Sequence, residues 1–268
     1  MSNQKAKLII FTGPSGVGKG TILTDFFKKV DKNIVYSISS TTRHSRDGEI
    51  NGMHYFFISK NEFENLIKFV KSNCKGEYIG VGNPISNVLF VGKEPAIPEE
   101  KKLQRLCEIE ENCTQWENNI NQGLDIIDIL PMYCKNYQYN PLYPYKGQKY
   151  SVYTEKSKKG QGGTSKTWYQ YQKLWDLICD GKPKSHSDFI DFHEHCFSTE
   201  LSSANEKYSS RVNSGNRTIS INLRKGLFGH PFYQRFSIVI LAVGHYPRQH
   251  DIDIESIFKT KWKGQRIL

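Results

Sequence analysis

The chain has 268 residues, which is enough for one large domain or two small ones. Its formal net charge is +10, and this basic excess suits a partner that carries phosphate groups, although it serves plain solubility equally well. No apolar run approaches the roughly 20 residues of a membrane-spanning helix, so we expect no membrane partner.

Six cysteines stand at positions 74, 107, 113, 134, 179 and 196, and none of them forms a Cys-x-x-Cys pair. No apolar leader segment precedes them. Cysteines in such a setting are usually reduced inside the cell. The sequence therefore predicts free thiols and a cytoplasmic location.

A glycine-rich segment lies between a predicted strand at 8–11 and a predicted helix at 21–30. Its glycines let the backbone turn tightly and point N–H groups into one concavity, and the following helix N-terminus favours bound phosphate. Lys19 supplies a charge for terminal phosphates, although Gly20 follows it where a P-loop has a hydroxyl residue. The alternative is a turn that binds nothing. The predicted phosphate-binding residues are Gly13, Ser15, Gly16, Gly18, Lys19, Gly20 and Thr21.

Two arginines, Arg43 and Arg46, follow a stretch of alternating residues that predicts a strand. Arginine side chains hold phosphate oxygens through paired hydrogen bonds, so this pair suits the phosphate of a mononucleotide. Ser39 and Tyr55 add hydroxyl donors, and an apolar run at 55–58 predicts a further strand.

Residues 5–68 resemble the first third of a guanylate kinase. The resemblance rests on the glycine-rich loop, on the motif Ser-Ser-Thr-Thr-Arg-x-x-Arg-x-Gly-Glu-x-x-Gly-x-x-Tyr-x-Phe and on the helix that opens at Lys60. It implies a P-loop-type unit that binds ATP with Mg²⁺ at 13–21 and transfers a phosphoryl group to GMP. It also implies Lys19, Arg43 and Arg46 as catalytic residues, and a GMP-binding set of Ser39, Arg43, Arg46 and Tyr55.

The rest of the guanylate kinase pattern is not recognisable after residue 68. Residues 77–84 faintly resemble the segment that reads the guanine base, and the stretch around Asp128 faintly resembles the acidic strand; an ordinary buried strand or helix explains both. No pair of lid arginines follows. Their loss removes transition-state charge stabilisation while leaving ground-state nucleotide binding mostly possible. Whether the kinase turns over is therefore an open question.

The remainder of the chain alternates between strand-like and helix-like patterns. Apolar runs at 87–92 and 237–243 are typical of buried parallel strands. Helices are expected at 98–122 and 164–178, the second opened by a hydroxyl cap.

These patterns predict an α/β protein with two parts. We expect a partial guanylate-kinase-like module at residues 1–70, followed by an α/β domain at 71–268 that contains a doubly wound, Rossmann-like parallel sheet. Ligands of such sheets gather at the carboxyl ends of the strands.

Short motifs lie at the ends of both predicted strands. Residues 91–95, Val-Gly-Lys-Glu-Pro, and residues 244–247, Gly-His-Tyr-Pro, distantly resemble motifs of the uracil-DNA glycosylase superfamily. The resemblance implies that Glu94 positions or activates a water and that His245 stabilises the leaving base. The alternatives are an acid that caps a turn and a histidine satisfied at a strand end.

A nucleic-acid partner follows as the alternative to the kinase function. In that interpretation a glycosylase-like domain is fused to a truncated, non-catalytic kinase module. Salt-dependent phosphate contacts are then expected from Lys146, Lys166, Arg224 and Arg248.

The segment 188–196 contains His193, His195 and Cys196, which are metal-ligand residue types. Histidines two residues apart face away from each other on a helix, and no second ligand cluster stands out. We therefore predict a structural or substrate-contact role for this segment rather than a metal site, and the stretch 197–201, which contains Glu200, equally suits the lining of a pocket near the strand ends.

Overall fold

The computed structural model describes residues 21–22, 25–26, 29, 40–41, 56–57, 60–73, 77–122, 124, 140–144, 149–150, 164–179, 181–185 and 189–259. The chain divides into two compact units, Met1–Phe57 and Ile58–Leu268.

In the first unit, strands β1 (Ser40–Thr41) and β2 (Phe56–Phe57) pair in parallel. Both lie within segments that the sequence predicts as strands. Thr21 is helical and exposed, as expected for the helix after the glycine-rich loop. The other residues of that loop lie outside the described part of the chain.

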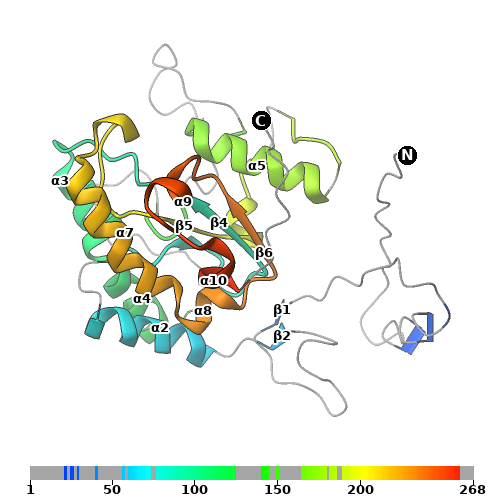
Figure 1. Ribbon diagram of the computed structural model, residues 1–268. Coiled ribbons are helices and arrows are strands. Elements are labelled where there is room, and N and C mark those ends of the chain that lie inside the picture. Colours follow the sequence, from blue (N-terminus) through cyan, green and yellow to red (C-terminus); the bar gives the residue numbers. More distant parts are fainter. Residues whose placement is uncertain are drawn as a thin grey trace. The chain divides into compact units, whose positions relative to one another are not determined.

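The second unit contains a four-stranded sheet (Figure 1). Its strands are β3 (Val81–Gly82), β5 (Phe197–Glu200), β4 (Val88–Gly92) and β6 (Ile238–Leu241), in that spatial order. β4 runs parallel to both β5 and β6, whereas β3 is antiparallel to β5. The predicted α/β class with a mostly parallel sheet is confirmed, and β4 and β6 lie at the two predicted apolar runs.

Helices cover both faces of this sheet. Successive side chains of a strand point to opposite faces, and every residue of β4 is buried because both faces are covered. On one face, the ring of Phe90 stacks on Tyr171 of α5 (Lys166–Cys179), with 4.6 Å between centroids. On the other face, Phe197 lies 6.4 Å from both Phe63 and Trp116. These two rings belong to α2 (Lys60–Asn73) and α4 (Asn112–Asn121), which lie opposite α5 in Figure 1.

The predicted helix at 98–122 is interrupted. It consists of α3 (Lys102–Arg105), the π-helix η1 (Leu106–Glu110) and α4. The backbone N–H of Glu111 donates to the carbonyl of Leu106, 2.8 Å away, and this i→i+5 bond widens the turn. Periodicity alone does not reveal such a local change of pitch. The predicted helix at 164–178 corresponds to α5, and the hydroxyl of Ser165 accepts from the N–H of Trp168 at 3.2 Å.

The carboxy-terminal half supplies the remaining elements. These are α6 (Phe192–His195), the 3₁₀ turn η2 (Ser209–Arg211), α7 (Ser214–Phe228), α8 (Pro231–Gln234), α9 (Tyr246–Gln249) and α10 (Ile254–Phe258). The long helix α7 begins at Asn213, whose side chain accepts from the backbone N–H groups of Gly215 and Asn216.

Arg224 of α7 lies in the core, where its side chain is fully buried. Its guanidinium donates to the Glu77 carboxylate at 2.9 Å, to the Thr199 hydroxyl at 2.9 Å and to the carbonyl of Glu200 at 2.8 Å. The expectation that Arg224 contacts phosphates is therefore wrong, because all three groups are internal. The same ion pair holds Glu77, in the segment that faintly resembles a base-reading motif.

Free thiols are present at Cys113, Cys179 and Cys196. Cys107, in contrast, is disulfide-bonded, so the expectation of free thiols is wrong for this residue. Disulfide pairing depends on the folded geometry, which cysteine spacing does not reveal. Within the described ranges, no helix is long and apolar enough to cross a membrane.

Candidate functional site

The candidate site lies at the carboxyl ends of β4 and β6. These strands are parallel neighbours, so the residues that follow them meet at one edge of the sheet. Gly244 adopts a φ of +57°, and a Cβ there would lie 3.1 Å from the Lys93 side chain. The glycine therefore allows the turn after β6 to approach the turn after β4 closely.

The Glu94 carboxylate is the centre of a hydrogen-bond network at this edge. Its side chain is only 2% exposed. Tyr246 donates from its hydroxyl at 2.7 Å to one carboxylate oxygen, and Arg217 donates at 3.1 Å from Nη2 and at 3.3 Å from Nε. The hydroxyl of Ser209 donates as well. The carboxylate is thus fixed by groups from α7, α9 and η2.

Sequence reasoning missed these three partners of Glu94. Tyr246 stands inside the Gly-His-Tyr-Pro motif, beside the residue that was singled out, whereas no sequence signal links Arg217 or Ser209 to Glu94. His245 precedes α9 and is exposed. The structure thus brings the two motifs together through Tyr246, and the individual roles of Glu94 and His245 stay predictions.

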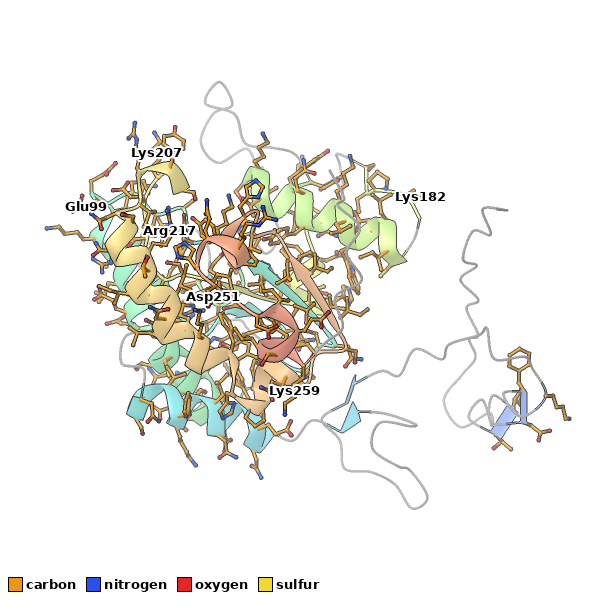
Figure 2. The ribbon with its side chains drawn as sticks, viewed as in Figure 1. Glu99, Lys182, Lys207, Arg217, Asp251 and Lys259 are labelled. Atoms are coloured by element: carbon orange, nitrogen blue, oxygen red, sulfur yellow. The ribbon has the colours of Figure 1, made fainter. Side chains whose placement is uncertain are left out.

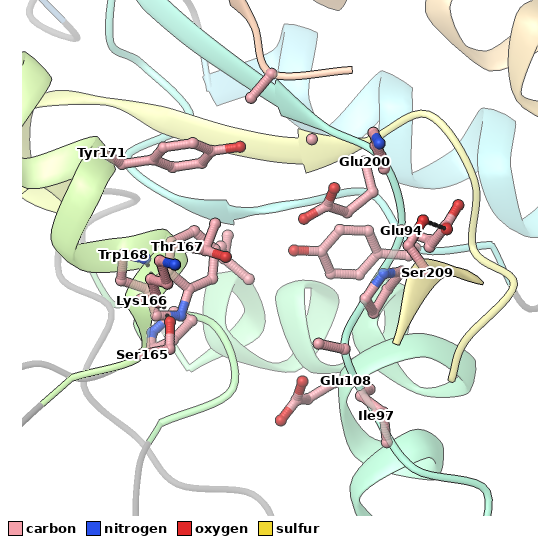
Figure 3. Close-up of a pocket in the computed structure, with 18 of the residues that line it drawn as sticks. Glu94, Ile97, Glu108, Ser165, Lys166, Thr167, Trp168, Tyr171, Glu200 and Ser209 are labelled. Atoms are coloured by element: carbon pink, nitrogen blue, oxygen red, sulfur yellow. Dashed lines mark hydrogen bonds between the residues drawn. The ribbon is translucent and has the colours of Figure 1, made fainter. Parts of the chain in front are cut away.

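A cavity of about 580 Å³ opens beside this network (Figure 3). This volume lies within the range of ordinary small-molecule sites. In Figure 3, Glu200 and Glu108 lie across the hollow from Thr167 and Trp168 at the start of α5. The charged and aromatic residues that line it include Glu94, Glu108, Lys166, Trp168, Tyr171 and Glu200.

Aromatic rings give the cavity flat, apolar walls. Trp168 and Tyr171 both line it, and their rings meet edge to face with centroids 5.7 Å apart. Tyr171 is backed by Phe90 of the sheet, so its position is fixed by the core. Burial raises the pKa of the phenols of Tyr78 and Tyr171, which therefore keep their protons and can donate hydrogen bonds.

Glu200 ends β5 and brings a carboxyl group into the cavity. Burial raises the pKa of this group to about 8; Arg224 opposes the shift and Glu94 adds to it. Gly92 of the neighbouring strand leaves the space, since a Cβ there would collide with the Glu200 carboxylate. Glu200 belongs to the stretch 197–201 that the sequence suggests for the lining of a pocket near the strand ends, and it does line this cavity, but no sequence signal gives its carboxyl group a chemical role.

Glu108 reaches the same cavity from the π-helix η1. It accepts a hydrogen bond from the side chain of Gln104 at 2.9 Å. Short π-helical turns are rare and occur often at functional sites. The irregular turn therefore supports the assignment of this cavity as the site.

The lysines and arginines predicted to contact phosphates have different positions. Lys166 is exposed and lines the cavity, and Arg248 is exposed on α9. Arg224 is buried in the core, as described above. Lys146 lies outside the described residues.

Most of the predicted nucleotide-binding residues also lie outside the described part of the chain. Thr21 is the exception. Within the described residues, no group of three or more potential ligands forms a metal site. The predicted ATP and GMP sites therefore stay predictions. The residues outside the description are Gly13, Ser15, Gly16, Gly18, Lys19, Gly20, Ser39, Arg43, Arg46 and Tyr55.

Comparison with known proteins bears on this first segment. The family model described as guanylate kinase matches residues 5–112. A guanylate kinase of Streptococcus thermophilus (strain CNRZ 1066) is 46% identical over 88 residues, which are 32% of this chain and 42% of the relative. A guanylate kinase of Streptococcus pyogenes serotype M3 is 44% identical over a segment of the same length, with the same two shares. The chain thus spans about two-fifths of the length of these curated relatives. No solved structure matches the chain.

The resemblance of the amino-terminal segment to guanylate kinases is confirmed, and it extends beyond residue 68. The matched segment continues through α2, β3, β4, α3 and η1 to the first residue of α4. It therefore includes a central strand of the sheet and one wall of the cavity. The resemblance to uracil-DNA glycosylases is a separate matter, and it stays a prediction.

Proposed function

We propose that the segment matched by the guanylate kinase family binds ATP and GMP and transfers a phosphoryl group between them in the cytoplasm. The observation that carries this proposal is the identity of 46% with a guanylate kinase over 88 residues. The family model matches residues 5–112, which contain the glycine-rich loop and both arginines of the sequence motif.

The roles follow from the chemistry of phosphoryl transfer, which depends on positioning and charge neutralisation. Lys19 neutralises the transferred group, and Arg43 and Arg46 hold the acceptor phosphate through paired hydrogen bonds. The hydroxyl groups of Ser15 and Thr21 are the candidate protein ligands for the Mg²⁺ that accompanies ATP. Mg²⁺ when bound supplies positive charge to the phosphates.

Nucleotide binding and turnover need different groups of the protein. Binding needs the loop and the arginines, whereas turnover also needs groups that read the base and neutralise the transition state. Glu77, in the segment that faintly resembles the base-reading motif, is 6% exposed and engaged by Arg224. We therefore propose nucleotide binding for the segment in every case, and turnover only if other residues replace these groups.

A coupled assay of ADP formation from ATP and GMP, run beside equilibrium ATP binding, tests both claims. We expect Lys19→Ala to weaken ATP binding at least tenfold. Lys29→Ala is the matched control, because Lys29 is a helical residue after the glycine-rich loop whose side chain is 75% exposed in an ion pair with Asp25. Unchanged ATP binding by Lys19→Ala would contradict the P-loop assignment.

A second candidate function belongs to the cavity of the second unit. We propose that this unit acts on nucleotides or nucleic acids in the manner of a glycosylase. The observation that favours it is the position of the Glu94 and His245 motifs, which follow neighbouring parallel strands beside an aromatic-walled cavity. Aromatic walls suit a planar base that has been turned out of a strand.

Binding to single- and double-stranded oligonucleotides at several salt concentrations tests this candidate. Phosphate contacts make affinity fall with rising salt. We expect Lys166→Glu to weaken binding and reduce the salt slope, whereas Lys182→Glu, an exposed lysine after the other end of α5, leaves both unchanged (Figure 2). Absence of salt-sensitive binding would count against a nucleic-acid partner.

A further inference from the structure

Glu200 and Glu94 are two carboxyl groups at one cavity with different surroundings. Glu94 accepts hydrogen bonds from Tyr246, Arg217 and Ser209. Within the described part of the chain, no side chain donates a hydrogen bond to the carboxyl group of Glu200. In Figure 3 this group lies at the hollow itself, so it is available to a bound molecule.

The other acids of the cavity are less suitable for direct chemistry. Glu108 shares its carboxylate with Gln104. Glu94 has both oxygens occupied by donors. Glu200 is therefore the acid whose oxygen atoms are free to exchange a proton with a ligand.

The nearby guanidinium of Arg224 does not change this conclusion. It donates to the backbone carbonyl of Glu200 and to Glu77, not to the Glu200 carboxyl group. Its charge is shared with the Glu77 carboxylate at 2.9 Å. Lys93, Glu108 and Lys166 also line the cavity, but within the described residues no cation forms an ion pair with the Glu200 carboxyl group, and burial favours its neutral form.

We propose that Glu200 is the general acid of this site and protonates the leaving base during hydrolysis of the N-glycosidic bond of a nucleotide. This inference rests on the second candidate function. Two observations point to this substrate class: the flat walls formed by Trp168 and Tyr171 fit a planar base, and the volume of about 580 Å³ accommodates one nucleotide.

The proposed reaction balances without any further reactant than water. The bond between the sugar carbon and the base nitrogen breaks, and its electron pair stays with the base. The proton of Glu200 passes to the base, which leaves as a neutral molecule. Water then adds to the sugar carbon, and its proton passes to the ionised Glu200, which restores the acid. The nucleotide is either free or part of a single strand, since both present the same bond.

The pH dependence follows from the groups around Glu200. Glu94 follows β4, Arg224 comes from α7, and Tyr78 and Tyr171 belong to the segment before β3 and to α5. Burial and Glu94 raise the pKa of Glu200 to about 8, against the effect of Arg224. Only the protonated form can act as an acid, so the rate should be constant below this pH and fall about tenfold per unit above it.

The test measures release of free base by the full-length protein from three probes. These are dUMP, dGMP and a single-stranded oligonucleotide that carries one deoxyuridine. We expect release from at least one probe, with a rate that falls above about pH 8. Comparison of the mononucleotides with the oligonucleotide distinguishes the two sources of the substrate.

Substitutions then separate the role of Glu200 from the function itself. Glu200→Gln should lower kcat about 100-fold or more and remove the fall at high pH, because the amide cannot lose this proton. Glu200→Asp keeps a carboxyl group and should retain a pH limb, which guards against a variant that only fails to fold. Glu99→Gln, at an exposed acid away from the cavity lining, should behave as the wild type (Figure 2).

Two different results would overturn the inference. If Glu200→Gln is folded and releases base at the wild-type rate with the wild-type pH profile, Glu200 is not the acid, but the glycosylase-like function stands. If the wild type releases base from none of the probes, both the function and the inference fail.

Discussion

The ion pair between Arg224 and Glu77 lies in the core, so we expect the loss of either side chain to lower stability strongly. The side chains of both residues are almost fully buried, and their charged groups are 2.9 Å apart. Removing one partner of such a pair leaves an uncompensated charge in the core. We expect Arg224→Ala to lower the free energy of unfolding by about 3–5 kcal/mol, measured by urea denaturation.

A surface ion pair provides the control for this prediction. Lys71 and Glu117 also approach each other, but their side chains are 45% and 35% exposed. Exposed pairs contribute about 1 kcal/mol or less, so Lys71→Ala should have a small effect. The interpretation would be contradicted if Arg224→Ala cost no more than Lys71→Ala.

The carboxyl group of Glu200 should also make stability depend on pH. Its pKa is raised to about 8 in the folded protein, from an ordinary value of 4.5. Between these two values the folded state keeps a proton that the unfolded state loses, so the free energy of unfolding falls as the pH rises. Glu200→Gln should remove this loss, which amounts to at most about 1.4 kcal/mol per pH unit, in urea denaturation at pH 5 and pH 8.

His193 gives the opposite slope at lower pH and must be separated from Glu200. Burial lowers the pKa of this imidazole from 6.5 to about 3. The unfolded state therefore binds the extra proton first, and stability is lost as the pH falls below 6.5. A decline between pH 7 and pH 8 that is unchanged in Glu200→Gln would show that Glu200 does not cause it.

At the scale of single elements, helix α7 connects the core to the site. It carries Arg224, which holds the core pair, and Arg217, which holds Glu94. The helix begins at Asn213, whose side chain caps the free N–H groups of the first turn. We expect Asn213→Ala to lower the free energy of unfolding by about 0.5–2 kcal/mol.

Asn213→Asp is the matched control, because a carboxylate caps a helix as well as an amide does. Thermal denaturation followed by circular dichroism measures both variants. Equal destabilisation by the alanine and aspartate substitutions would show that the cap is not the cause.

Some of these elements could be predicted from the sequence and others could not. β4 and β6 are identified by continuous apolar runs, and the start of α5 by its hydroxyl cap, because these signals are local. The network around Glu94 joins residues separated by more than 100 positions, and no local pattern encodes such a pairing. The π-helix escaped prediction for a related reason, since one wider turn barely changes the apolar periodicity.

For the whole molecule, the position of the domain boundary is the main question. The sequence predicts a boundary at residue 70, whereas the compact units divide after Phe57. The boundary predicted at residue 70 falls inside helix α2, which begins after Phe57, and four of the apolar side chains of this helix are no more than 2% exposed in the core of the second unit. These side chains are Phe63, Leu66, Ile67 and Val70.

Two fragments distinguish these boundaries. We expect the fragment 58–268 to unfold cooperatively, because it keeps α2. The fragment 71–268 should lose cooperative unfolding or aggregate, because it exposes the surface that α2 covers, including Trp116 and Phe232. Equal stability of the two fragments, measured by urea denaturation, would instead support the boundary at residue 70.

The position of strand β4 inside the sheet limits how this chain can evolve. The segment related to guanylate kinases extends to residue 112 and so includes β4, but the strands on either side of β4 come from the later part of the chain. A deletion of the whole kinase-related segment would also remove β4, an inner strand of the four-stranded sheet in the second unit. Selection to keep the cavity would therefore preserve about half of the kinase-related segment even in a lineage that no longer used nucleotides.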